Sequence, residues 1–228
     1  LDSMRRDFIS NLSHELRTPV SVIRANSETL IDGALDDKIQ GRIFAKAILH
    51  NAERLTDMVS SLLDLSRIEY GELKLNFEEI NLNSFINRYV QSISNLSKKK
   101  GIKIIFKSNH KGTISADLQA IERIMDNLID NAIKYSEKGS EITISTVNDS
   151  DGYIKVMIKD KGEGIADEDI NHIFSRFYRT ASARATENQG SGLGLAIVKH
   201  LVNSLNGEVG IESQPQKGST FWFTVPCV

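Results

Sequence analysis

The sequence predicts two domains of different class. The first is an all-α helical hairpin that dimerises into a four-helix bundle, and the second is an α/β two-layer sandwich. Apolar residues recur every seven positions over the first part of the chain, whereas short strands mixed with amphipathic helices follow it. We therefore expect a helical domain over residues 1–72 and a sandwich domain over residues 77–228.

The first helix carries a narrow apolar seam. Its members are Ile9, Leu16, Ile23 and Leu30, with Leu12 as a companion. His14 falls opposite this seam, Glu15 is its neighbour, and Thr18 lies one turn further along the same face as His14. An imidazole, a carboxylate and a hydroxyl thus share one solvent-facing patch. Pro19 removes a backbone N–H just beyond them and should bend the helix.

A second long helix follows a tight turn. Gly33 suits a helix C-terminus, Asp36 or Asp37 can cap the next helix, and Gly71 should end it. Its apolar stripe comprises Phe44, Ile48, Ala52, Leu55, Met58, Val59, Leu62 and Leu65. An isolated hairpin cannot cover stripes this wide, so we expect a homodimer. The alternative is a hairpin docked on its own second domain.

The amino-acid composition excludes several classes of protein. The 228 residues carry 28 basic and 30 acidic side chains, a net charge of −2, which does not suggest a nucleic-acid binder. Cys227 is the single cysteine, so no internal disulfide can form. No apolar run approaches the roughly 20 residues that span a bilayer. The chain starts at Leu1 in helical register, so any membrane anchor is expected in a missing upstream segment.

From about Phe77 the apolar period changes. A short strand is expected near Ile80 and Leu82, then a helix that continues to the lysines before Gly101. The further expected elements are strands at Ile102–Phe106, Glu141–Val147, Tyr153–Lys159, Glu208–Gly210 and Thr220–Val225, and helices at Leu118–Tyr135 and Leu193–Leu205.

Polar side chains form a stripe along the otherwise apolar helix Leu118–Tyr135. Asn127, Asn131 and Lys134 stand at positions i, i+4 and i+7. Amide oxygens beside a lysine suit a hydrated Mg²⁺ on a triphosphate. The competing interpretation is a polar stripe that only faces water.

Two glycine-rich segments follow. Asp160 ends a strand and precedes Gly162 and Gly164, so its carboxylate could accept the exocyclic amine of adenine while the ring lies on the glycines. The second segment comprises Gly190, Gly192, Leu193 and Gly194 and opens directly into a helix, which exposes backbone amides to phosphate. The stretch from Ile165 to Gln189 between them is expected to be a mobile lid.

These motifs resemble the sensor histidine kinases of two-component signalling. The segment His-Glu-Leu-Arg-Thr-Pro at 14–19 is similar to the phospho-acceptor box, residues 126–136 to the N box, 160–164 to the G1 box, 174–179 to the F box and 190–195 to the G2 box. Their order and spacing also agree with the family. The resemblance implies a Bergerat-type ATP-binding fold for the second domain.

The resemblance also implies residue roles. Asn127 and Asn131 would hold Mg²⁺ and phosphates, and Lys134 and Arg179 would meet phosphate. Tyr135 would line the adenine pocket, and Asp160 would bind the adenine amine.

The implied reaction is ATP-dependent autophosphorylation of His14, with Glu15 as proton acceptor. The phosphoryl group would then pass to an aspartate in the receiver domain of a response regulator. Thr18 could orient water for the reverse, phosphatase reaction. The expected location is the cytoplasmic portion of a membrane-anchored bacterial sensor.

Two alternatives remain. One is an ATP hydrolase of the related gyrase, Hsp90 and MutL kind, which carries a glutamate where this chain has Asn127. The other is a non-catalytic dimeric scaffold that binds nucleotide only to set its conformation.

Overall fold

The computed structural model describes residues 2–69, 74–110, 112–149, 152–185 and 190–228. The chain divides into two compact units, Leu1–Ser66 and Arg67–Val228, which are described separately. The predicted domain limits, 1–72 and 77–228, stay a prediction.

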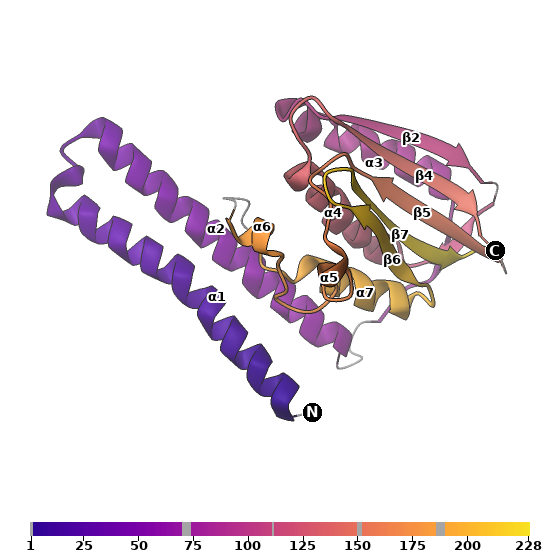
Figure 1. Cartoon of the computed structure of the whole chain (residues 1–228), viewed down its shortest axis with the longest axis horizontal. Coiled ribbons are helices and arrows are strands. Elements are labelled where there is room, and N and C mark those ends of the chain that lie inside the picture. Colours follow the sequence, from indigo (N-terminus) through magenta and orange to yellow (C-terminus); the bar gives the residue numbers. More distant parts are fainter. Residues whose placement is uncertain (1, 70–73, 111, 150–151, 186–189) are drawn as a thin grey trace. The chain divides into compact units, whose positions relative to one another are not determined.

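The first unit is a helical hairpin (Figure 1). Helix α1 (Asp2–Thr29) runs through Pro19 without a break in its assignment, so the expected bend stays a prediction. A π-helical turn, η1 (Leu30–Ala34), follows, and helix α2 (Lys38–Glu69) returns along α1.

Gly33 and Asp37 shape the turn between the helices. Gly33 has φ of 128°, a conformation that costs other residues strain. The Asp37 carboxylate accepts the backbone N–H groups of Ile39 at 2.8 Å and Gln40 at 3.1 Å, so Asp37 rather than Asp36 caps α2. Gly71, the predicted end of this helix, lies outside the described residues.

The second unit is built on a five-stranded sheet in the order β2-β4-β5-β7-β6. Its strands are β2 (Lys103–Asn109), β4 (Glu141–Asn148), β5 (Tyr153–Lys159), β6 (Val209–Gln214) and β7 (Gly218–Pro226). β2 and β4 are parallel, and the other pairs are antiparallel. A separate antiparallel pair joins β1 (Glu78–Ile80) to β3 (Ile114–Ala116).

Helices α3 (Leu82–Lys99), α4 (Leu118–Tyr135) and α7 (Gly194–Ser204) cover one face of the sheet (Figure 1). Every second residue of the central strands is buried on that face. These residues include Ile142, Ile144, Ile154, Val156, Ile158, Phe221 and Phe223. From α4 they meet a buried row that includes Ile121, Met125, Leu128 and Ala132. The predicted two-layer α/β sandwich is confirmed.

Several elements differ from expectation. The short strand expected near Ile80 and Leu82 ends at Ile80, and Leu82 begins the predicted helix, α3, because the Asn81 side chain caps it by accepting the Ser84 N–H at 2.9 Å. β3 was not predicted; three residues carry too little pattern, and they become a strand by pairing with β1. The expected lid contains two short helices, α5 (Asp167–Ile170) and α6 (Ala181–Ala185). Its last residues, 186–189, lie outside the described residues.

Candidate active site

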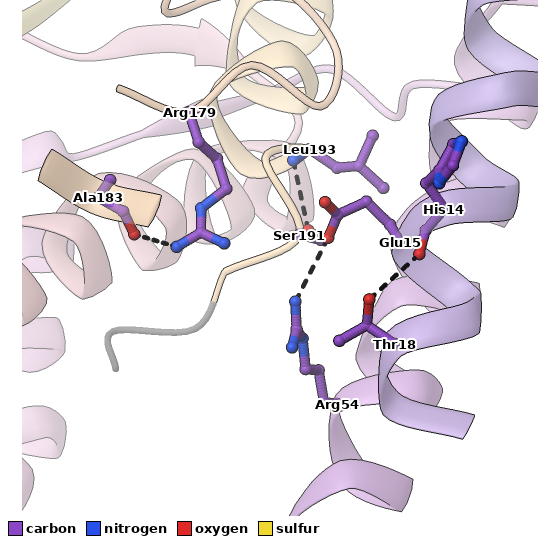
Figure 2. Close-up of polar contacts among 8 residues, drawn as sticks. All are labelled: His14, Glu15, Thr18, Arg54, Arg179, Ala183, Ser191 and Leu193. Atoms are coloured by element: carbon purple, nitrogen blue, oxygen red, sulfur yellow. Dashed lines mark hydrogen bonds and ion pairs between the residues drawn. The ribbon is translucent and has the colours of Figure 1, made fainter. Parts of the chain in front are cut away.

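His14 stands on the exposed side of α1. Within the described part of the chain, no side chain or backbone group hydrogen-bonds its ring. Thr18, one turn later, donates its hydroxyl to the His14 backbone carbonyl at 3.4 Å (Figure 2). The Thr18 hydroxyl therefore bonds its own helix, as serine and threonine side chains in helices often do.

Glu15 faces the second helix of the hairpin. Its Oε2 atom lies 3.3 Å from Nη2 of Arg54 on α2 (Figure 2). Arg54 was not predicted, because the pairing of two helices depends on the register of the hairpin and leaves no local signal in either helix.

In the second unit, Asn127 presents its side chain at the start of α7. Its Nδ2 donates to the Arg123 carbonyl at 2.7 Å, which fixes the amide. A Cβ atom added at Gly194 would lie 2.6 Å from Asn127 Oδ1, so this oxygen lies directly against the first residue of α7. Asn131 and Lys134 are half-buried further along α4. The amide oxygen predicted to bind a cation and the glycine-rich segment predicted to bind phosphate thus lie together.

Asp160 is buried at the end of β5, 4% exposed. Its Oδ1 accepts the backbone N–H of Gly162 at 2.8 Å and that of Ser219 at 3.1 Å. Burial raises the pKa of Asp160, and these two hydrogen bonds oppose the rise by stabilising the charged form. Among the described residues, both bonds go to Oδ1, so Oδ2 keeps its lone pairs for a ligand such as an amine.

Gly162 brings the segment after β5 against the end of α4. A Cβ atom there would lie 2.3 Å from the Tyr135 carbonyl oxygen, and Gly162 forms a β-bridge with Ser136. Gly164, with φ of 70°, approaches the Gln214 carbonyl even more closely: a Cβ atom there would lie 2.0 Å from that oxygen. Only glycine permits both approaches.

A cavity of 390 Å³ opens beside this contact. It is lined by Lys134, Tyr135, Ser136, Glu137, Lys161, Gly162, Glu163 and Gln216. Burial raises the pKa of the Tyr135 phenol, and the positive charge of Arg179 opposes that rise, so Arg179 lies near enough to act on this group. The volume falls in the range of small-molecule sites.

The second glycine-rich segment is anchored at Gly192 and Leu193. Gly192 has φ of 69°, and its carbonyl accepts the Phe177 N–H at 2.9 Å. Leu193 is fully buried, and its N–H donates to the Ser191 hydroxyl at 3.3 Å (Figure 2). A Cβ at Gly190 would meet nothing within 4 Å, so that residue borders open space. Arg179 donates to the Ala183 carbonyl in α6.

The structure thus brings five of the predicted residues of the second unit into contact, in two sets. Asn127 meets Gly194, Asp160 meets Gly162, and Gly162 meets Tyr135. The buried carboxylate of Asp160, the exposed backbone at Gly162 and the cavity beside Tyr135 are together suited to binding a nucleotide base. Within the described part of the chain, no three His, Cys, Asp or Glu side chains converge on a metal position. None of the described helices is long and apolar enough to cross a membrane.

Two family descriptions match the chain. Residues 4–71 match the "His Kinase A (phospho-acceptor) domain", and residues 116–228 match the "Histidine kinase-, DNA gyrase B-, and HSP90-like ATPase". The chain is 34% identical over 228 residues to the sensor histidine kinase WalK of Bacillus subtilis, covering 99% of this chain and 37% of WalK. The chain therefore spans little more than a third of that relative.

Solved structures of two histidine kinases have a similar fold. The Acinetobacter baumannii histidine kinase AdeS aligns with a TM-score of 0.76 at 27% identity, over 94% of this chain and 98% of that one. Histidine kinase ThkA, solved in complex with response regulator protein TrrA, shares the fold with a TM-score of 0.81 at 24% identity, over 99% of this chain and 63% of that chain. The chain belongs to the histidine kinases: it is a catalytic core with a phospho-acceptor domain and an ATP-binding domain.

Proposed function

We propose that this core uses ATP to phosphorylate itself on His14 and passes the phosphoryl group to an aspartate of a response regulator. The observation that carries the proposal is the exposed imidazole of His14, which has no hydrogen-bond partner among the described residues and stands within the segment that matches the phospho-acceptor family. The imidazole must first attack the γ-phosphorus and then present the bound phosphoryl group to a second protein, so it has to be exposed and free of competing hydrogen bonds.

In this proposal Asp160 accepts the exocyclic amine of adenine at its free Oδ2, and the base lies over Gly162 in the cavity beside Tyr135. Backbone amides from Gly190 to Gly194 and the side chains of Lys134 and Arg179 meet the phosphates.

Asn127 and Asn131 would hold Mg²⁺ through their amide oxygens. The position of Asn127 Oδ1 against Gly194 supports this role, because it presents an oxygen ligand where the phosphates would lie. The bound cation would neutralise charge on the phosphates.

The chemical step follows from the chemistry of imidazole. Nε2 of His14 forms a bond to the γ-phosphorus, and the bond from that phosphorus to ADP breaks. Glu15 accepts the Nδ1 proton, which makes the ring a better nucleophile. In the second step an aspartate oxygen of the receiver domain attacks, and the phosphorus–nitrogen bond breaks. The ThkA complex, although similar only in fold, supports a response regulator as partner.

We also propose a phosphatase activity in which Thr18 orients water against the phospho-aspartate. The Thr18 bond to its own helix is long, at 3.4 Å, so the hydroxyl can be released at little cost.

A homodimer is proposed for the same core. Large apolar side chains on the hairpin are exposed, among them Ile39 at 75% and Val59 at 48%, and a second copy would cover such a surface. ATP and response regulators are found in the cytoplasm, so we place the core there; the upstream membrane anchor stays a prediction.

Asn127 argues against the hydrolase alternative. The related hydrolases carry a glutamate at this position to activate water, whereas an amide cannot act as that base. The scaffold alternative requires only nucleotide binding and predicts no covalent label.

Labelling with γ-³²P-ATP and Mg²⁺ separates the three functions. We expect label that survives alkali, is lost in acid, and is absent from His14→Gln and Asn131→Ala. ADP release without any label would favour the hydrolase, and neither label nor ADP release would favour the scaffold.

A further inference from the structure

Glu15 is engaged by the opposite helix of its own hairpin. The contact to Arg54 joins two residues that are 39 positions apart in the sequence, and the side chains are 14% exposed for Arg54 and 31% for Glu15. Water screens such a pair less than one on an open surface. The pair therefore holds the Glu15 carboxylate beside Arg54 on α2.

This carboxylate is not placed to serve His14. Figure 2 shows Glu15 reaching toward Arg54 while the His14 ring leaves α1 in another direction. A general base must come within about 2.6–3.2 Å of the proton that it accepts, directly or through one water. The contact with Arg54 therefore holds the carboxylate away from the proton that it would accept.

The contact between Glu15 and Arg54 is also weak enough to break. It is a single contact at 3.3 Å rather than the two-pronged pair that arginine and a carboxylate can form. The buried Nε of Arg54 has no hydrogen-bond partner among the described residues, so the guanidinium is only partly satisfied by this arrangement. A small shift between α1 and α2 could exchange the partner of Glu15.

We propose that Arg54 is a positioning residue that restrains the kinase reaction: it holds the Glu15 carboxylate on α2, and phosphorylation of His14 begins when Glu15 leaves Arg54. The proposal rests on the proposed function of His14 and Glu15. It predicts that loss of Arg54 accelerates the reaction, which a residue that merely stabilised the hairpin would not do.

The test compares first-order rates of His14 labelling at saturating ATP. Arg54→Gln should raise the rate about two- to five-fold, the factor expected for losing one ion pair, with an unchanged KM for ATP. Arg54→Lys retains the charge and should stay near wild type. Arg42→Gln removes the same charge from an exposed position of α2 and is the matched control.

A double variant shows whether Arg54 acts through Glu15. In a Glu15→Gln background, Arg54→Gln should have no further effect. A lower or unchanged rate in Arg54→Gln, an equal rise in Arg54→Lys, or an equal rise without Glu15 would overturn the proposal. If Glu15→Gln gives no measurable label, the labelling rates of Arg54→Gln and Arg54→Lys alone decide whether the proposal holds. Label that persists in His14→Gln would instead overturn the proposed function.

Discussion

Asp160 places a carboxylate where water cannot solvate it well, and two backbone N–H groups compensate for only part of that cost. Its pKa is raised by burial, so the folded state binds a proton more tightly than the unfolded state does. The charge therefore costs stability at neutral pH. In the proposed function it is retained because the adenine amine needs an acceptor.

Replacing Asp160 with asparagine should separate the two effects. The asparagine Oδ1 can still accept both N–H groups, but the atom that then faces the adenine amine is Nδ2, a donor in place of the Oδ2 acceptor, and the amide carries no charge. We expect Asp160→Asn to weaken ATP binding about 10- to 100-fold, as measured by calorimetry, because a hydrogen bond to a charged group is lost.

The same variant has a pH signature. The cost of the wild-type charge is absent below the unfolded-state pKa, about 3.9, and is complete above the raised pKa of the folded state. The stability of Asp160→Asn relative to wild type should thus increase between pH 4 and pH 7 in urea unfolding. A difference that shrinks as the pH rises would contradict the raised pKa of Asp160.

At the scale of elements, the candidate nucleotide site depends on close contacts between backbone segments. Gly162 lets the segment after β5 meet the end of α4, and Gly194 lets α7 begin against Asn127. The site is therefore set by how closely these elements approach each other as much as by the side chains within it.

Alanine at Gly162 should force these elements apart. Its Cβ would lie 2.3 Å from the Tyr135 carbonyl oxygen, so we expect Gly162→Ala to lower the free energy of unfolding by about 1–3 kcal/mol, the usual cost of overpacking. Gly190→Ala places the same methyl group in open space and should leave stability within about 0.5 kcal/mol of wild type. Equal effects of the two substitutions in chemical denaturation would refute the proposed packing role.

Elements with strong local signals were predicted well. Leu118–Tyr135 matches α4, since its apolar period is regular and the Asp117 side chain caps it by accepting the Ala120 N–H at 2.8 Å. Tyr153–Lys159 matches β5, where apolar and polar residues alternate. β6 begins and ends later than expected because Glu212, Ser213 and Gln214 have no strand pattern of their own and pair with β7.

Contacts between segments that are distant in the chain could not be predicted from the sequence. The pairing of Glu15 with Arg54 depends on helix register, and the approach of Gly194 to Asn127 depends on how α4 and α7 pack. No periodicity or motif encodes either distance. The candidate site residues could be named from motifs, whereas the partners that hold them had to come from the structure.

The exposed apolar residues of the hairpin predict a homodimer. In a two-fold dimer both copies carry the substitution, so Val59→Glu would bury two charges in the interface. We expect it to shift the proposed dimer toward monomer and to raise the dissociation constant at least about 100-fold. Light scattering at micromolar concentration measures this directly. Ser60→Glu adds the same charge one position later, about 100° round the helix, and should leave the dimer intact.

The residue that receives the γ-phosphoryl group can be identified directly. The chain has five histidines, at positions 14, 50, 110, 172 and 200, and only His14 is expected to carry it. After incubation with ATP and Mg²⁺, mass spectrometry of peptides prepared at neutral to alkaline pH should locate the added phosphoryl group on His14. Phosphoryl groups on another residue, or none on a protein that binds ATP, would contradict the account.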